Sequence, residues 1–163
     1  MHPRAAELIA SLGLGPHPEG GFYREIYRDE ATVPHPTKGA TRSCVTCIYF
    51  LLPAGTFSAL HRVAQSEIWH HLEGDKLDLH VIDERGAHAH VVLGKDLAAG
   101  ERMQQVVHAG AWQAAVPMGD AYVLCGCTVA PGFDFADFEL PTRGELVERF
   151  PQHRALVERL TRP

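Results

Sequence analysis

Residues 55–74 read GTFSALHRVAQSEIWHHLEG, and the expected fold follows chiefly from this segment. The glycines at its two ends permit tight turns between strands, because glycine tolerates backbone conformations that other residues avoid. Side chains alternate across a strand, so His61 and Val63 share one face, and Glu67 returns toward the same interior on the next strand. The stretch therefore predicts two successive strands that bring an imidazole and a carboxylate into one interior.

Short runs of strand-forming residues, separated by Gly or Pro, continue on both sides of this stretch. About eight strands at such spacing favour an all-β sandwich or barrel. The runs are Phe22–Tyr27, Val45–Leu52, Thr56–Leu60, Glu67–Leu72, Leu77–Ile82, His90–Gly94, Met103–His108, Trp112–Val116 and Tyr122–Ala130.

The two ends of the chain predict short helices instead of strands. Residues Pro3–Leu12 carry proline at a position suited to a first helical turn. Thr142 and Glu145 have the spacing of a capping box for a helix that runs to about Phe150, and Pro151 opens a further helical turn. We therefore expect an all-β domain with short N-terminal and C-terminal helices.

Composition and charge predict a single domain and argue against a nucleic-acid-binding or membrane-spanning protein. The chain has 163 residues, which at ~150 residues per domain predicts one domain over residues 1–163. Fifteen Lys and Arg against twenty Asp and Glu give a net charge of −5, and no cluster of basic residues offers a nucleic-acid footprint. No apolar run approaches the ~20 residues of a membrane span. We expect no nucleic-acid partner and no membrane partner.

The four cysteines bear on the compartment and on metal binding. The N-terminus lacks the features of a secretory signal, so we expect a cytoplasmic protein with reduced thiols. Cys44 and Cys47 lie three residues apart on a predicted strand and face opposite sides, which argues against a zinc site shared with Cys125 and Cys127. Reduced core cysteines are the simpler interpretation.

Two of the predicted strands are apolar on both faces. Val45–Leu52 and Tyr122–Val129 leave little to present to water, so each should be buried once in the barrel and again beneath another element. The terminal helices or a partner subunit could supply that cover. A homodimer would suit a chain of this size.

Three segments together resemble one known family. Gly55, His61, Glu67 and Gly74 keep the spacing of the first cupin motif, and residues 17–28 (HPEGGFYREIYR) and 128–138 (TVAPGFDFADF) complete the likeness. The chain resembles an uncharacterised branch of the cupin superfamily, the DUF985 or cupin-5 type, over nearly its whole length. The resemblance implies a cupin (RmlC-like) double-stranded β-helix jelly roll, a homodimer, and a small-molecule pocket inside the barrel.

The resemblance departs from the cupin pattern at the metal ligands. Val63 stands where the first motif has a second histidine. The second motif matches residues 107–113, with Gln113 in place of its histidine, or residues 117–122, with Tyr122 there. Under either placement only His61 and Glu67 remain as ligands, so we expect no metal cofactor beyond a weakly bound divalent ion.

The same branch is similar in fold to deoxysugar epimerases. Tyr23 and Glu25 resemble the aromatic residue and the acid that contact the nucleotide in those enzymes. Gly20 stands where they carry an arginine, which argues against a nucleotide diphosphate ligand.

His61 occupies the position of the epimerase general base, and Tyr122 lies near the tyrosine that acts as the acid. Imidazole suits proton abstraction beside a carbonyl because its pKa is close to working pH. Glu67 could orient the ring and stabilise its cation.

The residues leave three functional hypotheses open. The first is a metal-independent isomerase or epimerase that transfers a proton on a carbohydrate-like ligand. The second is a non-catalytic ligand-binding cupin, in which His61 and Glu67 are a buried hydrogen-bonded pair, and the third is a metal-dependent enzyme with an incomplete ligand set. We expect the catalytic residues to be His61, Glu67 and Tyr122, and the ligand-binding residues to be Tyr23, Glu25, Trp69 and Gln113.

Trp69 and the pair His88 and His90 can each be explained without a functional role. Trp69 shares a face with Glu67 and could be either core packing or a wall for a ring-bearing ligand. His88 and His90 share one face beside a turn, and a solvated strand edge explains them.

Overall fold

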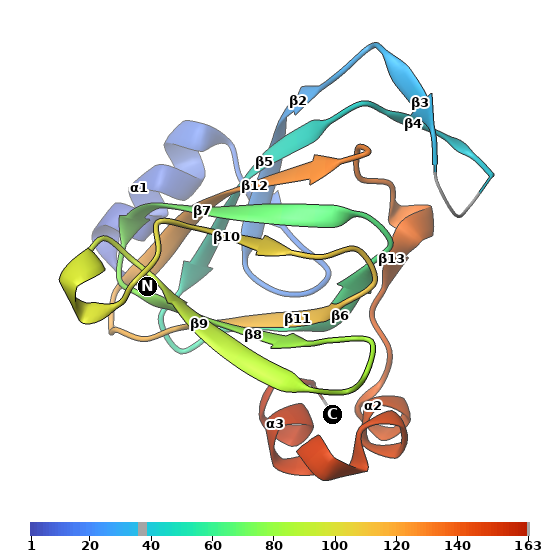
Figure 1. Ribbon diagram of the computed structural model, residues 1–163. Helices are drawn as coiled ribbons and strands as arrows, with labels where there is room; N and C mark the ends of the chain where they lie inside the picture. Colours follow the sequence, from blue (N-terminus) through green and yellow to red (C-terminus); the bar gives the residue numbers. More distant parts are fainter. Residues whose placement is uncertain (36–38, 163) are drawn as a thin grey trace.

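The computed structural model describes residues 1–35 and 39–162 and consists chiefly of two antiparallel sheets that face each other (Figure 1). The first sheet has the strand order β1 (Gly15–Pro16), β2 (Phe22–Arg28), β5 (Thr46–Pro53), β12 (Tyr122–Ala130), β7 (Ser66–Gly74) and β10 (Gln104–Val107). The second has the order β13 (Phe138–Glu139), β6 (Ser58–Val63), β11 (Trp112–Pro117), β8 (Leu77–Ile82) and β9 (His88–Leu93). The prediction of an all-β domain with short N-terminal and C-terminal helices is confirmed.

The remaining elements lie around this sandwich. A hairpin of β3 (Thr32–Pro34) and β4 (Thr41–Ser43) extends beyond the two sheets (Figure 1). The helices are α1 (Pro3–Leu12), α2 (Arg143–Arg149) and α3 (Arg154–Arg159), with 3-10 turns η1 (Leu97–Ala99), η2 (Phe135–Asp137) and η3 (Pro151–His153). Within the described residues, no helix combines the length and the apolar character needed to cross a bilayer.

Most of the predicted strands lie where the sequence placed them. β8 and β12 have the predicted bounds. β6 begins at Ser58 instead of Thr56, because Thr56 belongs to a turn in which its backbone N–H donates to the Pro53 carbonyl at 3.2 Å. The hairpin β3–β4 was not predicted, since its three-residue strands are too short to show an alternating pattern.

The cysteines contribute to the core between the sheets. Cys125 and Cys127 pack there with Phe50, Trp69 and Leu79, and all four cysteines are free thiols. Burial raises the pKa of the Cys125 thiol to about 12, so at neutral pH this side chain stays a neutral, apolar thiol.

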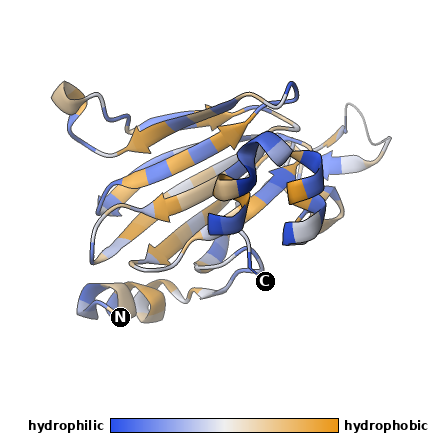
Figure 2. Cartoon of the chain, turned by 90° about the horizontal axis from the view of Figure 1, so that it is seen from below, coloured by the Kyte–Doolittle hydropathy of each residue, from blue (hydrophilic) through white to orange (hydrophobic). Residues whose placement is uncertain are grey.

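The terminal helices cover the outer faces of the two sheets. α1 packs Ala5 and Leu8 against Leu51 and Leu124 of β5 and β12. The C-terminal helices α2 and α3 cover the second sheet, where Leu146 belongs to a cluster with buried residues of β6 and β11. Figure 2 shows hydrophilic and hydrophobic residues alternating along the strands, with these helices lying across them. The helices thus supply part of the expected second layer, and the homodimer stays a prediction.

The capping box of α2 gives a first testable prediction. The Thr142 hydroxyl accepts from the Glu145 backbone N–H at 3.4 Å, and the Glu145 carboxylate accepts from the Thr142 N–H at 2.8 Å. T142A should lower the free energy of unfolding by about 1 kcal/mol in urea titrations, because a helix N–H loses its partner. T142S, which keeps the hydroxyl, should stay near wild type. Equal losses in both variants would contradict the assignment.

Candidate functional site

A cavity of about 430 Å³ lies between the two sheets. One part of its wall is aromatic and consists of Tyr23, Phe50, Trp69, Phe133, Phe135 and Phe138. Another part is polar and consists of His17, Glu19, Glu25, Arg28, His61 and Glu67. Such a combination of apolar walls and a few convergent polar groups is typical of small-molecule sites.

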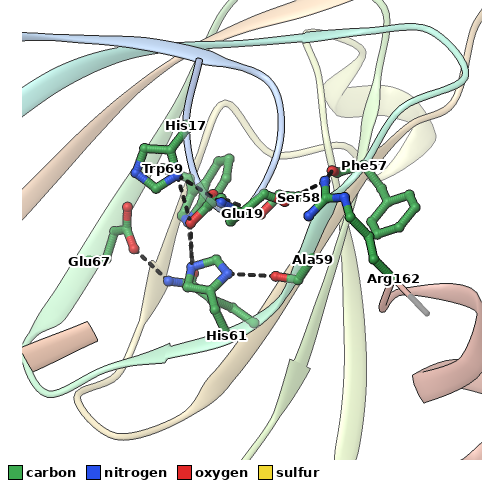
Figure 3. A network of polar contacts seen from close by, with 10 residues as sticks. His17, Glu19, Phe57, Ser58, Ala59, His61, Glu67, Trp69 and Arg162 are labelled. Carbon is green, nitrogen blue, oxygen red and sulfur yellow. Dashed lines mark hydrogen bonds and ion pairs between the residues drawn. The ribbon is translucent and has the colours of Figure 1, made fainter. Parts of the chain in front are cut away.

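Glu19 is the centre of the polar contacts (Figure 3). Its carboxylate accepts a hydrogen bond from the Ser58 hydroxyl at 2.8 Å through Oε1. Its Oε2 lies 3.2 Å from His61 Nε2 and 3.5 Å from His17 Nδ1. Glu19 and His61 are only 5% and 2% exposed, so these contacts are largely shielded from bulk solvent.

The hydrogen bonds of His61 indicate where its protons are. Its Nδ1 lies 2.7 Å from the Ala59 carbonyl oxygen, which can only accept, so Nδ1 carries the hydrogen. Burial lowers the pKa of His61 and raises that of Glu19 to about 8. At neutral pH a protonated Glu19 therefore donates to the lone pair of His61 Nε2, and the two residues share one exchangeable proton.

Glu67 is held by a separate chain of hydrogen bonds. The Trp69 indole N–H donates to Gln113 Oε1 at 2.9 Å, and Gln113 Nε2 donates to Glu67 Oε2 at 2.5 Å. Because an indole can only donate, the amide oxygen of Gln113 must face Trp69 and its nitrogen must face Glu67. Burial raises the pKa of Glu67, which favours its protonated form.

The arginine in the cavity wall is already paired. Arg28 donates to both carboxylate oxygens of Glu25, at 2.9 and 2.7 Å, and to the Phe133 carbonyl at 3.0 Å. Arg28 is thus committed to the protein and not free to bind an anionic ligand.

The structure brings together most of the residues predicted for the site. His61, Glu67, Tyr23, Glu25 and Trp69 all line the cavity. Gln113 does not line the cavity, but it is fully buried and contacts Glu67 and Trp69.

Tyr122 requires a correction, because the structure places it outside the cavity. Its hydroxyl donates to Glu73 Oε1 at 2.6 Å, and its ring packs with the residues of α1. Val123 and Cys125 of the same strand belong to the core between the sheets, whereas Leu124 packs with α1, as Tyr122 does. The predicted position of Tyr122 as the donor across the ligand is therefore wrong.

The contacts of the His61 ring add a carboxylate that was not predicted from the sequence. Of the described carboxylates, that of Glu19 is the one in contact with the ring, whereas the charge of Glu67 acts on the ring without such a contact and raises the pKa of His61 against the larger effect of burial. Glu19 and His17 were not predicted from the sequence because they lie in the loop between β1 and β2, where no strand alternation shows which way a side chain points. The sequence feature that could have pointed to Glu19 and His17 is the pair Gly20 and Gly21 beside them. Both glycines have positive φ and shape this loop.

His88 and His90 belong to a cluster on the second sheet. Their rings stack with His80, and the Asp78 carboxylate lies 2.8 Å from His90 Nδ1. Burial lowers the pKa of His80 and of His88. This cluster lies outside the cavity described above.

Comparisons with known proteins agree with this architecture. The family described as Cupin superfamily (DUF985) matches residues 6–141. The chain belongs to this family. A hypothetical protein from Leishmania major is 35% identical to this cupin. The match covers 98% of this chain and 99% of the Leishmania protein, with a TM-score of 0.92. A protein from Shewanella oneidensis is 41% identical, with 98% of each chain covered and a TM-score of 0.89.

More distant structures share the fold alone. A variant of oxalate decarboxylase from Bacillus subtilis is 15% identical, with 89% of this cupin and 36% of that chain covered and a TM-score of 0.57. A comparison with curated proteins finds no match.

The side chains at the motif positions of this cupin do not fit a metal ion. Val63 offers no donor atom, and Gln113 turns an N–H toward Glu67, which cannot coordinate a cation. In the described part of the chain, no group of three or more His, Cys, Asp or Glu is arranged to hold a metal. Weak binding of a divalent ion at His61 and Glu67 stays a prediction.

Proposed function

We propose that this cupin binds a small carbohydrate-like molecule in its cavity and isomerises or epimerises it by moving a proton beside a carbonyl. The observation that carries the proposal is the contact between Glu19 Oε2 and His61 Nε2, 3.2 Å apart, in the wall of a ligand-sized cavity. Buried acid and base groups with shifted pKa values are typical of proton-transfer sites.

The proposed proton transfer gives a role to His61, Glu19 and Glu67. When Glu19 is ionised, His61 Nε2 can accept a proton from the carbon next to the carbonyl, and the electron pair of the broken C–H bond forms an enolate. The Glu19 carboxylate then stabilises the imidazolium at 3.2 Å. Glu67, which burial favours in its protonated form, is the candidate that returns a proton to the ligand. Exchange with solvent restores the starting protonation.

The walls of the cavity support a neutral, ring-bearing ligand. Aromatic side chains such as Phe50 and Trp69, whose rings are 5.6 Å apart, offer flat apolar surface to the C–H face of a sugar. Glu19, Glu25 and Glu67 supply carboxyl groups, whereas Arg28 is committed to Glu25. Among the described wall residues, a phosphate group would therefore find no free cation.

The experiment is hydrogen exchange on a panel of small aldoses and ketoses in D₂O, followed by NMR. Wild type should exchange the proton beside the carbonyl of at least one sugar, and the rate should rise with pH through about 8, where Glu19 ionises. H61N and E19Q should lose about 100-fold or more, because each removes the shared proton site. Y122F should stay near wild type, because its hydroxyl lies outside the cavity.

Other outcomes would contradict the proposal in distinct ways. Undiminished exchange in H61N would remove the catalytic role of the imidazole. A sugar that binds tightly but keeps all its protons would favour the non-catalytic ligand-binding cupin. Loss of exchange after chelator treatment, with recovery on adding a divalent ion, would favour the metal-dependent enzyme.

A further inference from the structure

The end of the chain lies against the loop that carries Glu19. The Leu160 carbonyl accepts from the Leu60 backbone N–H of β6 at 2.8 Å. Two residues later, Arg162 Nη2 donates to the Glu19 carbonyl at 2.9 Å and lies 3.5 Å from the Phe57 carbonyl (Figure 3). Residues at opposite ends of the sequence thus meet behind the cavity.

Two independent donors fix the Glu19 backbone at this point. The Glu19 carbonyl accepts from the Ala59 N–H at 2.8 Å as well as from Arg162. Ala59 also supplies the carbonyl that holds His61 Nδ1. Arg162 and β6 therefore hold Glu19 and His61 through one connected set of hydrogen bonds.

The C-terminal segment is itself anchored. Arg143 of α2 donates to the Thr161 hydroxyl at 3.1 Å and to the Thr161 carbonyl at 2.7 Å. The Thr161 hydroxyl in turn donates to the Val157 carbonyl of α3 at 2.7 Å. The Arg162 guanidinium also lies over the Phe57 ring, 5.2 Å from its centroid. These contacts fix where the guanidinium sits.

The loop is shaped to accept this guanidinium. Gly20 has φ +116°, a conformation that other residues rarely adopt. A Cβ atom at Gly20 would collide with the Arg162 guanidinium and with the Phe57 carbonyl. The close approach of Arg162 to the Glu19 backbone thus depends on a glycine at position 20.

We propose that Arg162 is a positioning residue, which holds the Glu19 backbone so that the Glu19 carboxyl lies against His61. The titratable and charged groups that face Glu19 are His17 on its own loop, His61 on β6, Glu67 on β7, Cys127 on β12 and Arg162. Burial raises the pKa of Glu19, and this effect is opposed first by the Ser58 hydrogen bond and then by Arg162, which supplies a permanent positive charge. The catalytic meaning of this inference rests on the proposed function.

The test is a set of Arg162 variants of the full chain, studied by NMR with labelled Glu and His side chains. Titration of the Glu19 carboxyl and of the His61 ring needs no substrate, so its outcome is separate from that of the exchange assay. R162Q keeps a donor without the charge and should move the Glu19 midpoint upward by about half a pH unit or more. R162K keeps the charge and should titrate near wild type.

A matched control separates this effect from general damage to the C-terminus. R154A removes an exposed arginine from α3, paired with Glu158 at 3.5 Å, and should leave the Glu19 midpoint unchanged. If sugar exchange is observed, R162Q should lower its rate about tenfold or more at neutral pH, and R162K should restore most of it. A folded R162Q variant with the wild-type Glu19 midpoint would overturn the inference.

Discussion

Q113L is expected to lower the free energy of unfolding by about 4 kcal/mol at neutral pH. Gln113 is 1% exposed and joins the Trp69 indole N–H to the Glu67 carboxyl. Leucine has a similar volume, so the loss comes from two buried polar groups that are left without a partner and not from a cavity. Urea unfolding monitored by tryptophan fluorescence would measure it.

The loss caused by Q113L should depend on pH. Burial raises the folded pKa of Glu67, and the bond from Gln113 opposes that rise. A raised folded pKa means that the stability linked to this proton is present at low pH and is lost as pH rises through the folded value. Because Q113L raises the folded pKa further, its deficit should be smaller at low pH, where only the uncharged groups lack partners, and should grow as pH rises through the folded pKa of Glu67.

W69F is the matched control for Q113L. It removes only the indole donor and leaves the bond between Gln113 and Glu67 in place, so a smaller loss of about 1–2 kcal/mol is expected, and the two substitutions together should cost less than their sum. A deficit in Q113L that does not change as pH rises through the folded pKa of Glu67 would contradict the assigned link to Glu67.

Strand alternation made the interior of the barrel predictable from the sequence. His61, Val63, Glu67 and Trp69 all line the cavity, as the period of two residues requires. The helix ends were predictable for a similar reason, since Pro3 and the Thr142–Glu145 capping box act within one helical turn. In each case the signal and the structure it determines lie within a few residues of each other.

The errors arose where a side chain's position depends on distant contacts. Tyr122 was assigned from resemblance to an epimerase tyrosine, and because its strand is apolar on both faces, alternation did not show which face points into the cavity. Glu19 lies in a loop, and its direction is set by Ala59 and Arg162, which are 40 and 143 residues away along the chain. No local pattern encodes such contacts.

R42M is expected to lower the free energy of unfolding by about 3 kcal/mol at neutral pH. Arg42 of β4 donates to both oxygens of the Asp137 carboxylate, at 2.8 and 3.0 Å, and Asp137 is 2% exposed. Methionine replaces the length of the side chain but removes both guanidinium donors from a buried carboxylate, which keeps its hydrogen bond from Gln65. Thermal and urea unfolding would measure the difference.

The acid dependence of R42M should be opposite to that of Q113L. Arg42 holds the pKa of Asp137 below its usual range, so the stability it contributes is present above the unfolded pKa and is lost as pH falls through the folded one. Wild type and R42M should therefore converge in strong acid. R42K keeps the positive charge but cannot donate to both carboxylate oxygens in a bidentate contact. It should therefore recover part of the lost free energy of unfolding.

The Arg42–Asp137 pair also connects the hairpin to the cavity. Asp137 ends the turn η2, whose Phe135 lines the cavity together with the adjacent Phe138. Freeing Asp137 should therefore loosen the aromatic wall, and hydrogen exchange of backbone amides in residues 133–138 should be faster in R42M than in wild type at matched stability. If the Arg42–Asp137 pair holds the aromatic wall in place, its loss must speed exchange in residues 133–138. Unchanged protection there would show that the pair stabilises the fold without shaping the cavity.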